Sequence, residues 1–231
     1  MKISKISEQV KNKQKLNIFI DGNYQLSLTR KQVADLNLVV DLEISDETLV
    51  KLKGESVFTK YYQKSLDFLA RRARSESEVR KYIIQKSSKV SISKKRDGST
   101  IKIEPELETE EAEALAARIV EHLKQKKFLD DEQFAIYWAQ ARSAKNLSNK
   151  QLKQDLIKKG LTPGDIESAI AKLNQQKPEQ ESLSLLVAKL KNKSRYQDSQ
   201  KLMRYLASRG FSYQQIKEAI TEAETLEENE G

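Results

Sequence analysis

Histidine and cysteine, the side chains on which many catalytic and metal sites depend, are almost absent from this sequence. The 231 residues include one histidine, His122, and no cysteine. A histidine-based triad and an ordinary zinc site therefore both lack parts. His122 stands beside the apolar positions of an expected helix, which predicts a half-exposed structural side chain. No Gly-rich loop precedes a Lys-Ser or Lys-Thr pair, so the sequence shows no machinery for nucleotide hydrolysis.

One acidic cluster could hold Mg²⁺ for a nuclease, and it consists of Asp130, Asp131 and Glu132. The cluster directly precedes the helical run that starts at Phe134. Asp130 is a good N-cap, and acids in a first helical turn are favoured by the helix dipole. We therefore favour the capping interpretation and expect no catalytic residue, no metal and no cofactor. The nuclease remains an alternative hypothesis.

Positive charge is the more informative chemical feature. The net charge is +8, and residues 60–104 account for all of it, with thirteen Lys or Arg against five Asp or Glu. The last fourteen residues include six glutamates. A basic block with acidic flanks predicts a polyanion or an acidic protein as partner. A solvated, highly charged helical surface would give the same composition.

The helical spacing from Phe58 to Arg74 separates an apolar stripe from a basic one. The apolar stripe contains Phe58, Tyr62, Leu66, Leu69 and Ala73, and the basic stripe contains Lys60, Lys64, Asp67, Arg71 and Arg74. Such a ridge can engage phosphates or an acidic protein groove. With the nearby basic clusters, the candidate contact residues are Lys64, Arg71, Arg72, Arg74, Arg80, Lys81, Lys94, Lys95, Arg96, Arg142, Lys145, Lys150 and Lys153.

Tyr137 and Trp138 are the aromatic side chains that could stack on bases. Trp138 follows Phe134 by four residues, which is typical of a core position, so Tyr137 is the ring expected at the surface. No pattern here resembles sequence-specific readout of the major groove.

The elements that position these residues begin with a small β-rich module. Residues 15–20 and 24–28 alternate in polarity around Asp21-Gly22, the strongest short hairpin signal. Ile3 and Ile6 predict a third strand. Thr29 is expected to cap a short helix through Leu36, and Ser45 to open a longer, charged one.

From about residue 58 the pattern is helical and repeats. Leu152, Leu156, Gly160, Leu161, Ile166, Ala169 and Ile170 recur fifty residues later as Leu202, Leu206, Gly210, Phe211, Ile216, Ala219 and Ile220. A third copy, around Val79, Ile83 and Ile119, lies upstream. Capping boxes are predicted at Ser75 and Ser148, a simpler cap at Asp198, and left-handed helix ends at Gly160 and Gly210.

These signals predict a mainly α fold. The expected architecture is a set of tandem three-helix repeats forming an elongated curved rod, with a small β-rich N-terminal module. The expected boundaries are 1–56 for a β-hairpin-containing N-terminal module, 57–129 for repeat 1 with a basic hairpin insertion at about 88–110, 130–176 for repeat 2, 177–222 for repeat 3 and 223–231 for an acidic tail. Mean hydropathy of −0.70, no membrane-length apolar run and no signal-peptide core predict a cytoplasmic protein without membrane association.

Three strings of this sequence resemble the RecX family. They are Leu66-x-x-Leu69-x-x-Arg72-x-Arg74-Ser75-x-x-Glu78-Val79-x-x-Tyr82; Phe128 to Ala135 with Arg142 a turn later; and Leu156-x-x-Lys159-Gly160-Leu161 followed by Ile166 and Ile170. Each string mostly encodes caps and core, and their order and spacing carry the match. The resemblance covers residues 58–220. The hairpin insertion is longer than expected for the family, and the third repeat lacks the Asp-Asp signature.

The resemblance implies a regulator that is not an enzyme. RecX proteins resemble curved stacks of three-helix units that lie in the groove of the RecA filament on single-stranded DNA. They restrain ATP hydrolysis and strand exchange and act on filament assembly, in homologous recombination, DNA repair and the SOS response. The expected partners are therefore the RecA filament and DNA without sequence specificity, single-stranded or also double-stranded, bound by a monomer. The alternative is a sequence-independent single-stranded DNA-binding protein without a recombinase partner.

Overall fold

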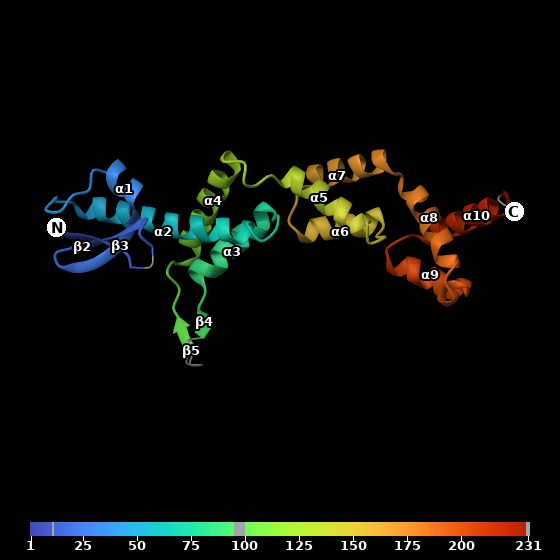
Figure 1. Ribbon diagram of the computed structural model, residues 1–231, viewed down its shortest axis with the longest axis horizontal. Coiled ribbons are helices and arrows are strands. Elements are labelled where there is room, and N and C mark those ends of the chain that lie inside the picture. The colour runs from blue at the N-terminus through green and yellow to red at the C-terminus, as the bar shows by residue number, and fades with distance from the viewer. Residues whose placement is uncertain (11, 95–99, 230–231) are drawn as a thin grey trace. The chain divides into compact units, whose positions relative to one another are not determined.

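The N-terminal module is a three-stranded antiparallel sheet with two helices. In the computed structural model, which describes residues 1–10, 12–94 and 100–229, strands β1 (Ile3–Glu8), β2 (Lys15–Ile20) and β3 (Asn23–Thr29) lie in the order β1-β2-β3 (Figure 1). Asp21 and Gly22 both adopt positive φ, 47° and 82°, as a tight hairpin turn requires. The predicted hairpin and third strand are confirmed.

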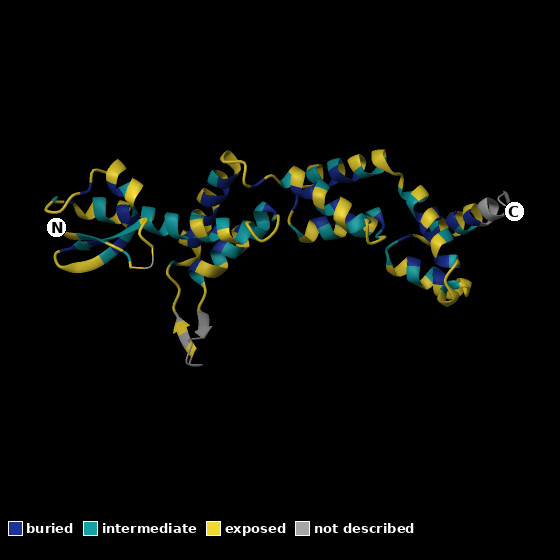
Figure 2. Cartoon of the chain, viewed as in Figure 1, coloured by how far each residue is buried: buried dark blue, intermediate teal, exposed yellow. Residues whose placement is uncertain are grey.

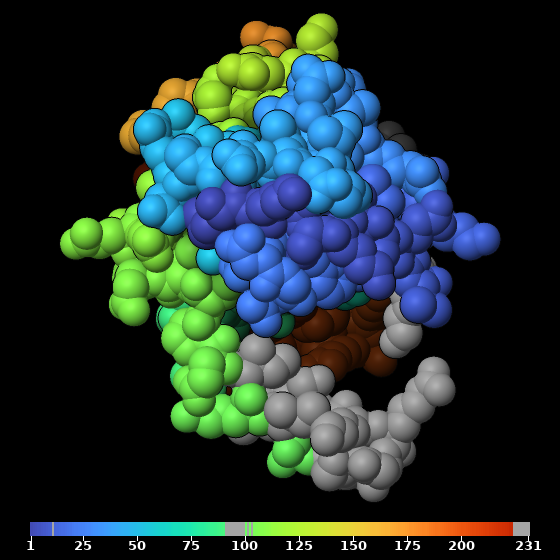
Figure 3. Space-filling view, turned by 90° about the vertical axis from the view of Figure 1, so that its left-hand side faces the viewer, coloured from blue at the N-terminus to red at the C-terminus, as the bar shows by residue number. Residues whose placement is uncertain are grey.

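Two helices cover this sheet. Helix α1 (Arg30–Asp35) starts at Thr29, which forms a capping box with Gln32, and helix α2 (Asp46–Leu69) starts at Ser45. Ile3, Ile18, Ile20, Leu26, Leu28 and Leu52 are among the buried residues of one core. Figure 3 looks onto this module, in blue. Helix α2 then continues unbroken from the sheet to the next elements, where the sequence suggested two helical segments.

The basic hairpin insertion stands between two helices. Helix α3 (Glu76–Ser88) leads to strands β4 (Ser91–Lys94) and β5 (Thr100–Ile103), which pair antiparallel, and helix α4 (Thr109–Gln125) follows. Lys95 and Arg96 lie outside the described residues. Ala112, Ala116, Ile119 and Leu123 are buried along one face of α4, as its helical spacing requires (Figure 2).

Two further groups of three helices follow, and each has its own core. Helices α5 (Asp131–Ser143), α6 (Asn149–Lys158) and α7 (Pro163–Gln176) enclose one cluster. Helices α8 (Glu179–Lys191), α9 (Ser199–Ser208) and α10 (Tyr213–Asn229), with a 3₁₀ turn at Ser194–Tyr196, enclose the other. Leu152 and Leu156 are buried in the first, and their counterparts Leu202 and Leu206 are buried in the second. The fold is mainly α with a small N-terminal sheet, as the sequence predicts.

The chain divides into two compact units. One comprises Met1–Arg72 with Arg80–His122, and the other comprises Ala73–Val79 with Leu123–Gly231. The second unit contains two joints of equivalent construction, which we call the α3–α6 joint and the α6–α9 joint. In each, the N-terminus of the earlier helix meets the C-terminus of the later one.

Hydrogen bonds to backbone groups of the facing helix ends define both joints. At the α3–α6 joint, Ser75 Oγ donates a hydrogen bond to the Lys159 carbonyl (2.7 Å), and the Glu76 N–H donates to the Asp131 carboxylate (2.8 Å). At the α6–α9 joint, the Ser148 N–H donates to the Arg209 carbonyl (3.0 Å), and the Asn149 N–H donates to the Glu179 carboxylate (2.6 Å). Helix N-termini leave N–H groups without partners, and each joint satisfies them from the following helices.

The predicted caps are found with one correction. The capping box of Ser75 is complete, because its hydroxyl accepts the Glu78 N–H and its own N–H donates to the Glu78 carboxylate. At Ser148 only the first half is present: the hydroxyl accepts the Gln151 N–H at 3.2 Å. The Ser148 N–H is taken by Arg209 of α9 instead, so packing against a neighbouring helix replaces the local glutamine. Asp198 caps α9 as predicted.

Candidate binding surface

The three carboxylates of the acidic cluster at the start of α5 each bind a different partner. Asp130 accepts the Gln133 N–H as an N-cap (2.9 Å), Asp131 accepts the Glu76 N–H, and Glu132 pairs with Lys172 (2.8 Å). Among the described residues no group of three or more His, Asp or Glu side chains is placed to hold a metal ion. The capping interpretation of Asp130 is confirmed.

Burial makes the Asp131 carboxyl a weaker acid than usual. Loss of solvent, followed by the negative charges of Glu76 and Asp165, raises the pKa of this carboxyl to about 6. The Glu76 N–H and the positive charge of Lys124 act in the opposite direction. Asp131 therefore acts in this fold as an acceptor at a helix N-terminus of the α3–α6 joint.

His122 and the two candidate stacking rings lie as the sequence predicts. His122 is half-buried. Its ring packs edge to face with the rings of Phe58 and Tyr62, at centroid distances of 5.8 Å and 5.1 Å. Tyr137 is exposed. Trp138 is partly buried and stacks on Phe134 at 5.8 Å, with the Lys159 ammonium 4.5 Å from its ring centroid.

The helix expected from Phe58 to Arg74 ends earlier, because α2 stops at Leu69. The fully buried positions near its centre are Tyr61 and Ser65, whereas the expected apolar positions Phe58 and Tyr62 are half-buried. Tyr61 is buried because its hydroxyl lies 2.8 Å from the Glu106 carboxylate and 3.0 Å from the Lys86 carbonyl. Burial, with the nearby Glu106 carboxylate, raises the pKa of the Tyr61 hydroxyl. The sequence spacing missed this position because a polar contact from a distant segment holds it.

Several predicted contact residues are engaged in ion pairs within the fold. In the second unit, Arg142 donates two hydrogen bonds to Asp155 (2.9 and 2.6 Å), and Lys153 pairs with Glu167 (2.7 Å). The Arg74 side chain, only 15% exposed, lies 3.9 Å from Glu78. A partner would have to compete with these carboxylates, least so for the exposed Lys153–Glu167 pair, because exposed ion pairs are weak.

Lys64 is also not a simple surface charge. Its ammonium lies 4.6 Å from the centroid of the Tyr61 ring and is half-buried. Burial, then repulsion by Lys60, lowers the pKa of the Lys64 ammonium, and Lys86 and Lys15 act in the same direction. Lys64 therefore belongs to a crowded basic cluster on the first unit that includes Lys15 of β2, a residue that sequence spacing could not connect to α2.

The remaining predicted residues form the exposed basic set. Arg71 and Arg72 lie in the turn after α2, Arg80 and Lys81 on α3, and Lys145 and Lys150 around the start of α6. Among the described residues, no carboxylate pairs with Arg71, Arg80, Lys81, Lys145 or Lys150, so these five keep their charge for an external anion. The side chain of Lys94, together with Lys95 and Arg96, lies outside the described residues.

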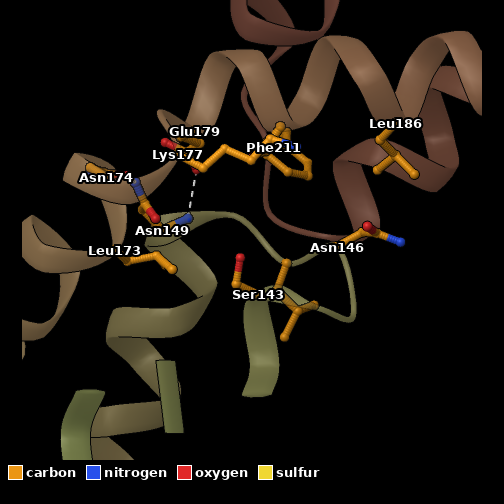
Figure 4. Close-up of a pocket in the computed structure, with 11 residues that line it drawn as sticks. Ser143, Asn146, Asn149, Leu173, Asn174, Lys177, Glu179, Leu186 and Phe211 are labelled. Carbon is orange, nitrogen blue, oxygen red and sulfur yellow. Dashed lines mark hydrogen bonds between the residues drawn. The ribbon is translucent and has the colours of Figure 1, made fainter. Parts of the chain in front are cut away.

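A small cavity at the α6–α9 joint is too small for an organic substrate. It measures about 30 Å³ and is lined by polar groups that include Asn146, Asn149 and Asn174, together with the side chains of Leu186 and Phe211 (Figure 4). This volume corresponds to about one water molecule. In the described part of the chain, no helix is long and apolar enough to cross a membrane.

Comparisons with known proteins match most of this chain. The family model described as regulatory protein RecX N-terminal domain matches residues 1–45, and the model described as RecX, third three-helix domain matches residues 186–220. The regulatory protein RecX of Oceanobacillus iheyensis is 27% identical over 238 residues, covering 99% of this chain and 79% of that protein. The regulatory protein RecX of Clostridium botulinum is 24% identical and covers 98% of both chains.

Solved structures share the fold. A crystal structure of regulatory protein RecX aligns with a TM-score of 0.62 and 24% identity, covering 94% of this chain and 98% of that chain. The crystal structure of RecX from Lactobacillus salivarius aligns with a TM-score of 0.53 and 22% identity, covering 73% of this chain and 97% of that chain.

Proposed function

Because the chain belongs to the RecX family, we propose that it regulates a RecA recombinase. Its main effect is inhibition: it binds along the RecA filament on single-stranded DNA and modulates ATP hydrolysis, strand exchange and filament assembly. The observation that carries this proposal is that the similarity to RecX proteins spans 98–99% of this chain. Exposed cations just after α2, on α3 and around the start of α6 support it, because Arg71, Arg80, Lys81, Lys145 and Lys150 have no carboxylate partner in the described part of the chain and suit contact with DNA phosphates or acidic protein surface.

The test is the rate of ATP hydrolysis by RecA on single-stranded DNA, with this protein added well below one copy per RecA. We expect strong inhibition that a matched amount of an unrelated basic protein does not reproduce. Salt-sensitive DNA binding without inhibition would instead support a single-strand-binding protein that has no recombinase partner.

A charge-reversal variant locates the surface. Arg71→Glu, Arg80→Glu and Lys81→Glu together should weaken inhibition at least tenfold, because three negative charges would then repel an anionic partner surface that the three cations attract. Arg74 is left unchanged because its ion pair with Glu78 is part of the fold. The control carries the same charge change at Lys31, Lys189 and Lys193, which are exposed. Equal inhibition by both variants would exclude the α2–α3 surface.

A further inference from the structure

An open groove of about 510 Å³ runs between β3 and α2 in the first unit. Its lining comes from the strands (Gln9, Lys15, Tyr24 and Ser27), from α2 (Lys53, Ser56 and Lys60) and from Glu106. Ser56 Oγ donates a hydrogen bond to the Ser27 carbonyl at 2.6 Å, which fixes the helix against the strand edge. The volume falls within the range of about 300–1,000 Å³ typical of ligand sites.

The groove carries an excess of positive charge. Glu106 is the one acidic residue among its described lining residues, and it is already bound by Lys60 (2.6 Å) and by the Tyr61 hydroxyl (2.8 Å). Although burial opposes it, these two hydrogen bonds hold the pKa of Glu106 below its usual value, so the carboxylate stays ionised and occupied. Lys15 and Lys53 have no carboxylate partner among the described residues.

Repulsion among the lysines points to the same excess. The lowered pKa of Lys64 arises first from burial and then from the charges of Lys60, Lys86 and Lys15. Cations held this close without enough carboxylates raise the local concentration of anions. An anion bound in the groove would relieve the repulsion.

An exposed aromatic ring stands on the strand side of the groove. The Tyr24 side chain is 56% exposed, its hydroxyl lies 3.0 Å from Ser27 Oγ, and its ring meets Phe19 edge to face at 5.9 Å. Gln9 holds Ser27 in turn, donating to its hydroxyl oxygen at 2.8 Å. The ring is therefore oriented before any ligand arrives, which lowers the entropy lost on stacking.

From this arrangement we propose that the groove between β3 and α2 binds a single strand of nucleic acid, with phosphates on Lys15 and Lys53 and a base stacked on Tyr24. Lysine binds phosphate as a point charge without a fixed geometry, which suits a backbone bound without sequence specificity, and the cations among the described lining residues are all lysines. Stacking on a side chain requires an unpaired base, which favours a single strand over a duplex. This proposal rests on the proposed function in one respect only: the RecA filament would be the source of the single strand.

Direct binding of a fluorescent oligothymidylate of about fifteen nucleotides to the full chain, without recombinase, tests the charges. Lys15→Glu with Lys53→Glu should lower affinity about tenfold or more and make the dependence of log affinity on log salt shallower by about 1.4, the loss of two phosphate contacts. The control pair Lys31→Glu with Lys189→Glu changes net charge equally outside the groove. Equal effects of the two pairs would overturn the proposal.

Photocrosslinking tests the role of the Tyr24 ring, because it identifies the peptide in contact with the oligonucleotide even if DNA also binds elsewhere. Irradiation of an oligonucleotide containing 5-iododeoxyuridine should crosslink to the peptide that contains Tyr24. Tyr24→Ala should abolish this adduct and weaken binding about fivefold or more, whereas Tyr24→Phe keeps the ring and should retain binding. Crosslinks found only in other peptides would overturn the proposal, as would lysine-dependent binding of a polyglutamate peptide in place of the oligonucleotide.

The two proposals fail in different ways. If the groove variants lose oligonucleotide binding but the wild-type protein does not inhibit RecA, the groove proposal stands and the proposed regulatory function is wrong. If the wild-type protein inhibits RecA but the groove variants bind DNA as the control does, the regulatory function stands and the groove proposal is wrong.

Discussion

The α3–α6 joint and the α6–α9 joint use the same backbone groups as hydrogen-bond partners and differ in their side chains, since Ser75 donates from its hydroxyl and Ser148 from its N–H. Both place a buried serine, Ser75 or Ser148, against the last carbonyl before a left-handed glycine, and both lend a carboxylate to a helix N-terminus. The α3–α6 joint adds charge: Lys159 pairs with Glu78 at 2.9 Å and lies over the Trp138 ring.

At the α6–α9 joint, the position of Glu78 is taken by Gln151, and a small polar cavity lies nearby. The comparison indicates that the backbone contacts set the register between successive helix groups, while side chains set how strongly each joint is held. The single tryptophan, Trp138, lies at the charged joint and packs on the α5–α7 core, so its fluorescence reports on both.

The largest expected effect is that of a methyl group at the joint glycines. Gly160 has φ +79°, and an added Cβ would lie 2.5 Å from the Ser77 Cβ, which no side-chain rotation can move away. Gly160→Ala should destabilise the protein by about 3 kcal/mol, from the left-handed backbone and from overpacking. Urea denaturation followed by Trp138 fluorescence measures the loss.

The matching change at the other joint should cost less. An alanine Cβ at Gly210, φ +92°, would press on Ser148 Oγ and lie 3.1 Å from the Gln151 Cβ, and the hydroxyl can rotate. We expect about 2 kcal/mol for Gly210→Ala, which includes a weakened cap. Ser77→Gly should partly rescue Gly160→Ala and leave Gly210→Ala unchanged. Rescue of neither variant would contradict the steric explanation.

The second prediction removes the charge that distinguishes the joints. Glu78→Gln should cost about 1–3 kcal/mol, because the Glu78 and Lys159 side chains are 19% and 21% exposed and the lysine loses a charged hydrogen bond. Gln151→Ala at the equivalent place should change stability by less than about 0.5 kcal/mol. A double-mutant cycle of Glu78→Gln with Lys159→Met measures the coupling, and a coupling energy of zero would mean that the ion pair contributes nothing.

Local signals were sufficient to predict most of the fold. Asp21-Gly22 predicts the hairpin because both residues tolerate positive φ, and Gly160 and Gly210 end helices for the same reason. Ser75, Asp130 and Asp198 act as the N-caps that their positions predict. These features depend on residues within one helical turn of each other, so sequence spacing is enough to find them.

Long-range contacts explain what the sequence left out. Tyr61 is buried by partners 25 and 45 residues away, and the Ser148 N–H is satisfied by a carbonyl 61 residues away. The sequence also did not show that Arg74, Arg142 and Lys153, which remain predicted contact residues, each lie beside a carboxylate of the fold. Spacing shows where cations lie along a helix, but only the tertiary structure shows which of them face a carboxylate.

The smallest effect concerns pH and separates the two carboxylates that cap the joints. Burial raises the pKa of Asp131 to about 6, from an ordinary value of 3.8. The folded protein therefore takes up a proton between pH 6 and 4 that the unfolded chain binds only below about pH 4. The contribution of Asp131 to stability is thus complete below about pH 4 and is lost as pH rises through about 6.

Asp131→Asn should remove this dependence while keeping an oxygen that accepts the Glu76 N–H. We expect the variant to be more stable than the wild type at pH 7, and the difference in melting temperature to shrink as pH falls to 5. Glu179→Gln, the equivalent change at the α6–α9 joint, controls for groups that titrate elsewhere. Parallel melting profiles for the wild type and Asp131→Asn between pH 4 and 7 would show that the α3–α6 joint tolerates the ionised carboxylate, so that charge distinguishes the joints only through Glu78.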